Sequence, residues 1–397
     1  DGATPWITTG VTTLNAGSSS IVLDNLSNSL GAIAIGGTPS SVLITDNTDL
    51  TQASAWTIGT APVTLDARNH HIDLSTSGNV LGNIHITTTN GVPLSVKITE
   101  NDAITQGSTW VLNGVPVTLV AENDKAITLT NASNILGNLT VTGGTVSIRE
   151  NDTITQGGAW TTTGTTTLNA ATNAITLNNT SNVLGALAFG GTPSAISITE
   201  NSDITQAAAW NLTSTPITLN SQSHDILLTQ ASNQLGDLTL TGQNVSVTEN
   251  HVISDGGAWT VPGLTTLTAG TNAIVLDANP KSDFGTVKIV SASAADITDA
   301  NGLIFDTSSI TSTLTVTAGG AITQIGPIVA QSLLLVGTGN ATLTNVANNI
   351  VNLAAGFSGG SLAYTDADNF TVAVINGTTG VNIGANDVSL TSVAGTV

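Results

Sequence analysis

Residues 133–160 read SNILGNLTVTGGTVSIRENDTITQGGAW, and this stretch holds the marks that recur along the chain. The marks are the pair Leu136-Gly137, the triplet that runs from Ile154 to Gln156, and Trp160. Between them, apolar residues alternate with threonine, as in the run from Leu139 to Thr142. Alternation with a period of two, interrupted by Gly and Asn, predicts short half-buried strands joined by tight turns.

The six tryptophans mark a repeat near 50 residues, because their spacings are 50, 54, 50, 50 and 49. They are Trp6, Trp56, Trp110, Trp160, Trp210 and Trp259. A Leu-Gly or Phe-Gly pair follows each tryptophan, with the glycine at Gly31, Gly82, Gly137, Gly185, Gly236 and Gly285. The Ile-Thr-Gln triplet or a close variant recurs as well, and it decays to Ile253-Ser254-Asp255 in the fifth copy. Because these marks repeat in phase, we predict six repeats over residues 1–305.

The repeats predict an all-β fold, a parallel β-helix or β-solenoid of stacked coils. A propeller blade has more aromatic residues and longer polar loops, and a sandwich does not repeat six times in phase. A single coil cannot bury its own apolar side chains, whereas stacked coils bury them in a continuous core. About six short strands fit in a repeat, which favours two coils of roughly 25 residues each. Residues 306–397 lose the tryptophan mark and keep the alternation, so we expect the same solenoid to continue there with shorter coils.

Stacked coils place equivalent residues of successive repeats in a line. We expect the six tryptophans to form such a structural ladder in the core or at a corner, with a sugar-stacking surface as the alternative. An asparagine precedes each Leu-Gly pair, and these residues are Asn28, Asn79, Asn134, Asn182 and Asn233. Because an amide both donates and accepts, we expect the asparagines to stack in one line and bond one another.

The composition excludes several classes of protein. Six Lys and Arg residues against a net charge of −20 cannot build the basic face that a nucleic-acid binder needs. The chain has no Cys, so it has neither disulfides nor a Cys zinc site. No apolar run approaches the ~18 residues of a membrane span. A low content of charged residues and few trypsin sites suit an extracellular protein.

Acidic residues recur once per repeat, and they are the candidate metal ligands. The pairs are Asp46 with Asp49, Glu100 with Asp102, Glu150 with Asp152, and Glu200 with Asp203. A row of carboxylates and carbonyls suits Ca²⁺, and the alternative is a solvated turn in which Asp and Asn bond the local backbone. We expect no other cofactor.

No arrangement of residues in the sequence points to catalysis. The five histidines show no metal-binding spacing, and no Ser/His/Asp arrangement is recognisable. A β-helix enzyme that cleaves acidic polysaccharides needs basic residues, yet the two arginines, Arg68 and Arg149, lie in different repeats. We therefore predict that the protein is not an enzyme and has no catalytic residues.

Several motifs resemble the repeat regions of filamentous haemagglutinin-like exoproteins. They are the Ser-Asn-x-Leu-Gly corner, ADITDANGLIF at 295–305, LTVTAGGAITQ at 314–324 and NNIVNLAA at 348–355. The resemblance implies right-handed parallel β-helices in long bacterial surface or secreted fibres that serve adhesion, biofilm matrix and cell contact. The family's secretion domain carries Asn-Pro motifs near its N-terminus, whereas here such a pair, Asn279-Pro280, lies in the sixth repeat. We therefore expect an interior piece of a longer protein.

These observations together predict an extracellular structural protein, a rigid solenoid that forms part of a cell-surface fibre or filament. Its expected partners are neighbouring repeats of a longer chain or further copies of itself, because uncapped coils leave strand edges open to head-to-tail stacking. One alternative is an adhesin module that binds glycans or a host surface. Another is a β-helix enzyme that cleaves polysaccharides with paired carboxylates.

Overall fold

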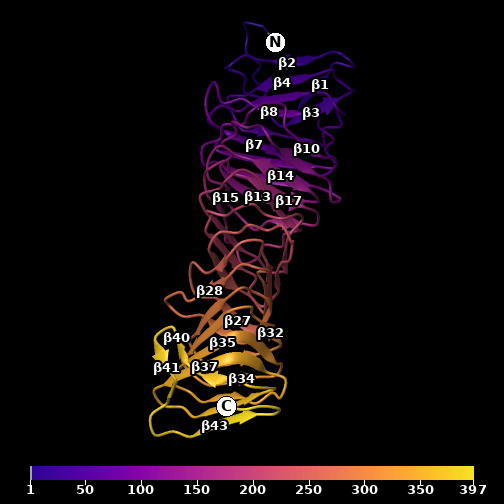
Figure 1. The fold of residues 1–397 in the computed structure, drawn as a ribbon. Helices are drawn as coiled ribbons and strands as arrows, with labels where there is room; N and C mark the ends of the chain where they lie inside the picture. The colour runs from indigo at the N-terminus through magenta and orange to yellow at the C-terminus, as the bar shows by residue number, and fades with distance from the viewer. Residues whose placement is uncertain (1) are drawn as a thin grey trace. The chain divides into compact units, whose positions relative to one another are not determined.

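A computed structural model of the chain describes residues 2–397. These residues form strands, turns and bends without a helix, and the strands stack in parallel as a β-solenoid (Figure 1). One antiparallel hairpin, described below, departs from this pattern. The predicted all-β parallel solenoid is therefore confirmed.

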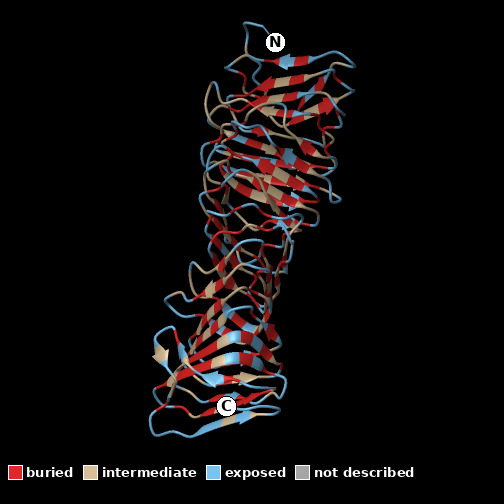
Figure 2. Cartoon of the chain, in the orientation of Figure 1, coloured by how far each residue is buried: buried red, intermediate tan, exposed pale blue. Residues whose placement is uncertain are grey.

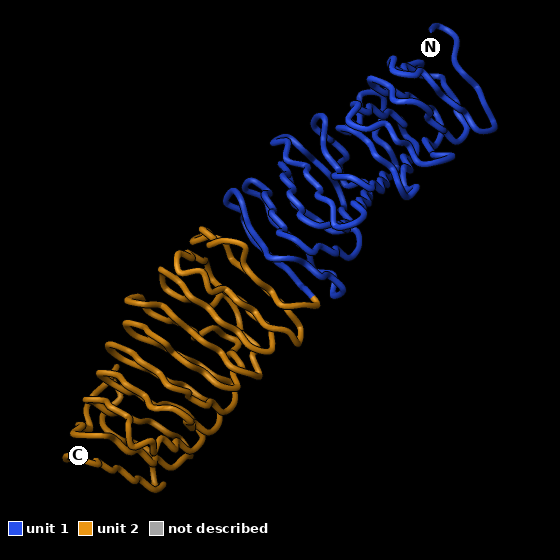
Figure 3. The backbone as a smooth tube through the Cα atoms, turned by 90° about the vertical axis from the view of Figure 1, so that its right-hand side faces the viewer, with its two compact units in different colours: residues 1–200 blue, residues 201–397 orange. Residues whose placement is uncertain are grey.

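The chain divides into two compact units, residues 1–200 and residues 201–397 (Figure 3). The division falls inside the 1–305 segment in which we predicted six repeats. Within each unit, strands of successive turns pair in parallel, and most consecutive strands of the chain alternate between two paths of paired strands.

In unit 1, sheet A contains β5 (Leu50–Thr51), β7 (His71–Leu74), β9 (Ser95–Glu100), β11 (Pro116–Ala121), β13 (Asn138–Gly143), β15 (Thr155–Gln156) and β16 (Thr161–Thr162). Sheet B contains β10 (Ile104–Thr105), β12 (Ile127–Leu129), β14 (Val146–Arg149), β17 (Thr166–Asn169) and β19 (Leu187–Phe189). A bridge between Ile84 and Gln106 joins β10 to β2 (Ile21–Leu23), β4 (Val42–Thr45), β6 (Val63–Asp66) and β8 (Ile84–Ile86). The remaining strands are β1 (Thr12–Asn15), β3 (Ile33–Gly36), β18 (Ile175–Leu177) and β20 (Ile196–Thr199).

In unit 2, one path of paired strands runs through β21 (Ile204–Thr205), β23 (Ile226–Leu228), β25 (Val245–Thr248), β27 (Thr260–Thr268), β29 (Asp283–Ser291), β31 (Leu303–Phe305), β34 (Ile322–Gln324), β36 (Ala341–Leu343), β38 (Leu362–Asp366) and β43 (Val388–Ser392). The other path runs through β26 (Ile253–Ser254), β28 (Ile274–Leu276), β30 (Ala295–Asp299), β33 (Thr313–Ala318), β35 (Ile328–Gly337), β37 (Asn349–Phe357) and β39 (Thr371–Val372). Beside these paths lie β22 (Ile217–Asn220), β24 (Leu238–Thr241), β32 (Ser308–Ser309), β40 (Val374–Ile375), β41 (Thr378–Thr379) and β42 (Val381–Asn382).

The strands form where the sequence alternates, because alternate side chains point into the core. In β11, for example, Val117, Leu119 and Ala121 are buried while Thr118 and Val120 lie on the outer face. Figure 2 shows the same alternation of buried and exposed residues along many of the strands. β-Branched threonine fits the outer positions, since it suits a pleated surface that is half buried.

One turn of the solenoid takes fewer residues than we predicted. Val42 pairs with Val63, and Val63 pairs with Ile84, so equivalent residues here lie 21 apart rather than roughly 25. The strands of unit 1 have two to six residues each.

A repeat therefore makes two and a half turns, and the prediction of two whole turns is wrong. The triplets at Leu50–Thr51 and Thr155–Gln156 lie two repeats apart, and both belong to sheet A. The order β5-β7-β9-β11-β13-β15 places them five turns apart. The triplet between them, at Ile104–Thr105, lies in sheet B. Successive copies of the motif thus alternate between the two sheets.

The same alternation holds in unit 2. Ile204–Thr205 lies on the path that leads to β43, and Ile253–Ser254 lies on the path that leads to β39. Beyond residue 306 the strands keep parallel pairing, with Leu314 against Leu333 and Ile322 against Ala341. Both pairs are 19 residues apart in the sequence.

The antiparallel hairpin of β40 and β41 interrupts the last turn of unit 2. The hairpin lies in the chain between β39 and β42, and both of these strands pair with β37. Its Ile375 packs on Leu334 and Ala354, which are outer-face residues of β35 and β37. These outer positions are apolar and buried because the hairpin covers them.

Candidate functional site

A buried asparagine stands at one corner of each of the first five repeats. In the third repeat, Asn134 Oδ1 accepts the backbone N–H of Trp110 at 3.1 Å and a bond from the Gln106 amide. Its Nδ2 donates to the carbonyl oxygens of Leu129 at 3.4 Å and Arg149 at 3.1 Å. Because Trp110 and Arg149 belong to the turns on either side, one side chain ties three turns together.

The partners of this asparagine are the same from repeat to repeat. The corresponding bonds of Trp56 to Asn79, Trp160 to Asn182 and Trp210 to Asn233 measure 2.8, 2.9 and 3.0 Å. The glutamine of each triplet bonds the asparagine side chain in the same way, at Gln52, Gln156 and Gln206. The predicted bonding of asparagine to asparagine is wrong, because successive asparagines lie two and a half turns apart and bond glutamine and backbone instead.

The same network recurs at Asn348, which the predicted ladder did not include. Asn348 Oδ1 accepts the backbone N–H of Ile328 and a bond from Gln324, and its Nδ2 donates to Leu343 and Thr365. Tryptophan was the mark used to find the corners, and an isoleucine stands in its place here. The triplet Ile322-Thr323-Gln324, followed by an asparagine 24 residues later, was the available signal.

Five of the six tryptophans belong to the core. Trp56, Trp110, Trp160, Trp210 and Trp259 are between 0 and 2% exposed. In four of them the indole N–H donates to a carbonyl oxygen of the preceding turn, at Ile33, Ile84, Leu139 and Leu238, over 2.9 to 3.2 Å. These five side chains cannot stack on a sugar, which rules out the surface alternative for them. Trp6, in the first turn, is 44% exposed.

An acidic side chain is buried beside each of the six asparagine corners and beside Ser282, which accepts the backbone N–H of Trp259 in the sixth repeat. The set is Asp46, Glu100, Glu150, Glu200, Glu249, Asp299 and Asp366. In the glutamates, Oε1 accepts the backbone N–H of the leucine of the Leu-Gly pair, for example Leu81 to Glu100 at 2.9 Å and Leu136 to Glu150 at 2.7 Å. Burial raises the pKa of Glu100 to about 8, that of Glu150 to about 7 and that of Glu249 to about 8.

The glycine of each pair is required by the backbone of the neighbouring turn. A Cβ on Gly185 would lie 1.7 Å from the carbonyl oxygen of Gly164, and one on Gly31 would lie 1.9 Å from that of Gly10. A heavy atom cannot occupy either position. The Leu-Gly motif therefore combines a buried leucine with the point at which two turns approach most closely.

The acidic pairs predicted as calcium ligands are split between the core and the surface. Asp46, Glu100, Glu150 and Glu200 point inward, whereas Asp49, Asp102 and Asp152 are exposed and Asp203 lies outside the core as well. Within residues 2–397, no three His, Asp or Glu side chains gather closely enough to hold a metal ion. Calcium binding stays a prediction from the sequence, and the structure identifies none of these residues as a ligand.

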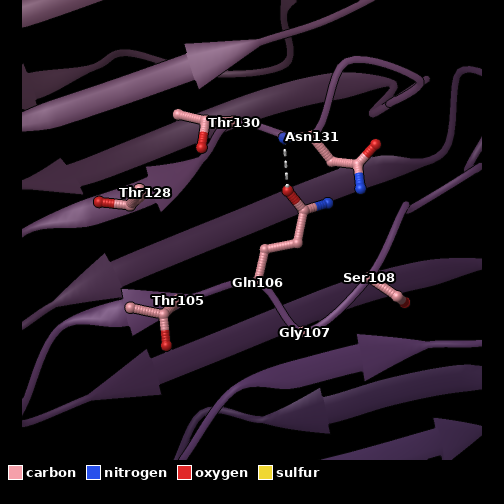
Figure 4. A pocket seen from close by; sticks show the side chains of 7 residues that line it. All are labelled: Thr105, Gln106, Gly107, Ser108, Thr128, Thr130 and Asn131. Atoms are coloured by element: carbon pink, nitrogen blue, oxygen red, sulfur yellow. Dashed lines mark hydrogen bonds between the residues drawn. The ribbon is translucent and has the colours of Figure 1, made fainter.

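A hollow lies on the outer face of sheet B in unit 1 (Figure 4). Its volume is about 290 Å³, and it is lined by Thr105, Gln106, Gly107, Ser108, Thr128, Thr130 and Asn131. Gln106 Oε1 accepts the backbone N–H of Asn131 at 3.1 Å. The glutamine that bonds the buried Asn134 therefore also positions Asn131 at the edge of the hollow. The next repeat forms an equivalent hollow of about 390 Å³ that includes Thr155, Gln156 and Asn179. All the lining residues are neutral and most carry a hydroxyl or an amide.

The structure also brings together three polar residues that the sequence analysis did not connect. His71 pairs with Ser95 in the ladder, and His71 Nδ1 lies 2.7 Å from Ser95 Oγ. Asp49, one turn earlier, accepts the backbone N–H of His71 at 3.1 Å. A spacing of 22 and 24 residues, about one turn, was the signal that could have linked them. Asp49 thus orients the strand, and no contact of its carboxylate with the His71 ring is seen among the described residues.

Stacked parallel turns tied by repeated buried corners define this protein as a repeat β-solenoid scaffold. A family model described as repeats of unknown function (DUF5649) matches residues 134–189, 183–241, 234–291 and 292–356. These segments cover more than half of the chain, so the chain belongs to this family. Three of them begin at or next to a corner asparagine, at Asn134, Asn182 or Asn233.

A search of curated proteins and a search of solved structures each found no match. Residues 2–397 form no helix with the length and hydrophobicity that crossing a bilayer takes.

Proposed function

We propose that this solenoid is an extracellular structural protein, a length of scaffold within a bacterial surface or secreted fibre. The corner network supports this proposal, because an asparagine such as Asn134 bonds three successive turns and repeats along the chain. Six Lys and Arg residues in 397 leave few sites for trypsin-like proteases, which suits a protein exposed outside the cell. The resemblance to filamentous haemagglutinin-like exoproteins supports a role in fibres, adhesion or biofilm.

Immunogold electron microscopy of intact producing cells tests the location. We expect label on the surface of unpermeabilised cells or on material released from them. Label that appears only after the cells are permeabilised would contradict the proposal.

We also propose that a further parallel turn covers the first turn of this chain, supplied by neighbouring repeats of a longer protein or by a second copy of the chain. Trp6, Ile7 and Val11 are exposed there, by 44, 72 and 63%. The other tryptophans at this motif position are covered by the preceding turn, with indole bonds to its carbonyl oxygens. The last turn of another copy would supply the same kind of parallel strand edge.

Sedimentation velocity at rising protein concentration tests the association with a second copy. We expect oligomers that a Trp6→Ser and Ile7→Ser double variant no longer forms. Because neither residue is buried, the variant should keep its fold, as circular dichroism would verify. Wild-type chain that stays monomeric throughout would defeat the association.

Adhesion to neutral glycans is the second candidate, and the hydroxyl-lined hollows favour it. Neutral hydroxyl and amide groups can recognise sugar hydroxyls through hydrogen bonds. A glycan array probed with the wild type and with a Thr128→Val and Thr130→Val variant would test it. We expect binding that the variant reduces, and no binding to any glycan would end this candidate.

We propose no catalytic activity for the chain. On the sheet that carries His71 and Ser95, the backbone N–H groups serve the parallel ladder, so an oxyanion formed at Ser95 lacks preorganised donors. Release of nitrophenol from a simple acyl ester, lost in Ser95→Ala, would overturn this view. A fall in the viscosity of acidic polysaccharides would do the same for a lyase or glycosidase.

A further inference from the structure

The buried acids of the corners are a feature that a purely mechanical scaffold does not require. In Glu100, Glu150 and Glu249, Oε1 takes a backbone N–H from Leu81, Leu136 or Leu235 at 2.7 to 2.9 Å. The second oxygen, Oε2, is buried and has no hydrogen-bond partner in any of the three. A carboxylate left with an unpartnered oxygen in an apolar core is costly, whereas the protonated acid carries no charge.

Two of the three aspartates at equivalent corners show a different solution. Asp299 accepts the N–H of Phe284 on one oxygen and that of Asn301 on the other, each at 2.7 Å. Asp366 likewise receives bonds on both oxygens, from Ile350 and Tyr364 on Oδ2 and from Asp368 on Oδ1. The shorter side chain remains beside its own turn, where additional backbone donors are available. At the Asp46 corner, Oδ1 accepts bonds from Leu30 and Thr48, while Oδ2 is buried without a hydrogen-bond partner. The unpartnered oxygen is therefore shared by the three glutamates and Asp46, and is not found at Asp299 or Asp366.

We propose that Glu100, Glu150 and Glu249 act as a proton-operated lock, which holds neighbouring turns together when the acids are protonated and loosens them when the acids ionise. The lock joins each acid to a Leu-Gly corner, and the glycine of that corner contacts the preceding turn at Ala61, Val115 or Thr215. It would make the scaffold most stable in mildly acidic surroundings and progressively weaker as the surroundings become alkaline.

Neighbouring carboxylates also raise the pKa of two of the three acids. The carboxylate of Asp102 acts on Glu100, and that of Asp152 acts on Glu150, and both raise the pKa of the buried acid beyond the effect of burial. For Glu249 burial alone raises the pKa, and the Leu235 N–H lowers it in part. Among the residues that the structure describes, no Lys, Arg or His shifts the pKa of any of the three.

The sign of the effect follows from linkage. An unfolded glutamic acid ionises near pH 4.5, whereas these folded acids keep their protons to about pH 7 or 8. Between these limits the folded chain binds more protons than the unfolded chain, so stability falls as pH rises. The contribution is complete below about pH 4.5 and is lost by about pH 8.

Thermal unfolding followed by circular dichroism from pH 5 to pH 9 tests the lock. The measurements are made in about 0.5 M salt, so that repulsion among the surface carboxylates is screened. We expect the wild-type midpoint to fall by several degrees across this range. The variant Glu100→Gln, Glu150→Gln, Glu249→Gln should lose most of this dependence, because Gln keeps the acceptor oxygen and cannot ionise.

A matched control removes three exposed carboxylates instead, in Asp124→Asn, Asp283→Asn, Asp387→Asn. This control should keep the wild-type dependence on pH. If the glutamine variant does not fold, calorimetry of the wild type at pH 6.5 in buffers of different ionisation enthalpy replaces it and should show proton release on unfolding. A flat wild-type profile, an equal slope in the glutamine variant, or no proton release would overturn the proposal.

Discussion

At the scale of single residues, the solenoid depends on a few side chains that satisfy the backbone at its corners. Strands satisfy their own N–H and C=O groups through the parallel ladder, but a corner breaks the ladder and leaves buried polar groups. The Asn134 side chain forms hydrogen bonds with two backbone carbonyl oxygens and one backbone N–H, and the Glu150 side chain accepts a hydrogen bond from another backbone N–H. The recurrence of these residues therefore reflects the same unmet hydrogen bonds at each corner.

Replacing Asn134 with alanine should destabilise unit 1 strongly. The change leaves the N–H of Trp110 and the carbonyl oxygens of Leu129 and Arg149 buried without their partner, which costs about 3 kcal/mol. Urea denaturation measures the loss. Asn178→Ala is the control, because Asn178 is exposed and a single bond, from Ser197, is seen at its side chain. Equal effects of the two changes would show that the corner network does not carry this stability.

The Leu-Gly glycines give a second test at this scale. In Gly185→Ala the new methyl would overlap the carbonyl oxygen of Gly164, so the two turns must separate, at a cost of about 2 kcal/mol or more. Gly10→Ala is the control, since nothing lies within 4 Å of the position that its methyl would take. The midpoints of thermal unfolding compare the two, and a Gly185→Ala chain as stable as the wild type would contradict the close approach.

At the scale of elements, the strands are too short to be stable alone and depend on their neighbours in the adjacent turns. β5 and β10 have two residues each, yet their Leu50 and Ile104 side chains are fully buried. β15 also has two residues, and Ile154 directly before it is fully buried. The β40–β41 hairpin shows the same dependence on the outer face. Its Ile375 covers Leu334 and Ala354, which would otherwise be an apolar patch on a surface that is mostly threonine.

Removing the apolar contact of this hairpin should loosen the end of unit 2. Ile375→Ser takes a buried side chain from its contact with Leu334 and Ala354, which should cost about 2 kcal/mol locally. Hydrogen exchange with mass spectrometry should show faster exchange in β35 and β37. Val374→Ser provides the control from the adjacent residue, which is 64% exposed. Unchanged exchange in Ile375→Ser would show that the hairpin does not hold these turns.

At the scale of the whole molecule, the composition follows from the solenoid architecture. Within each unit the core runs through every stacked turn, which accounts for the high content of Val, Ile and Leu. The outer faces hold mainly Thr, Ser and Asn, so charge is confined to 8% of the residues. Several of the basic residues, such as Lys97, Arg149 and Lys288, lie in strands, whereas Lys125 and Lys281 lie in segments between strands.

This placement predicts the order of cleavage by trypsin. Proteases need an extended, locally unfolded segment, so the first cuts should follow Lys125 and Lys281, while Lys97, Arg149 and Lys288 remain protected. Mass spectrometry of a time course identifies the fragments. Heat-unfolded chain, as the control, should be cut at all six basic residues. Early cleavage after a strand residue would show that the ladder there opens more readily than the structure indicates.

Much of the fold was predictable because its signals are local. Strands follow from alternation over a few residues, such as Leu139 to Val141, and the repeats follow from tryptophans and Leu-Gly pairs in constant phase. Parallel stacking then followed, since it is the arrangement in which such units bury one another's apolar faces. The burial of the tryptophans was favoured on the same grounds.

What the tertiary structure decided is which residues meet across a turn. The length of a turn depends on pairing such as Val42 with Val63, and alternation within a strand carries no information about it. For the same reason, the sequence did not predict that successive triplets alternate between two sheets. It also did not predict that Glu100 points inward while the nearby Asp102 is exposed. A local pattern specifies strands and repeats through short-range sterics and hydrogen bonding, whereas partners about one turn apart in the chain are selected only when the turns close on one another.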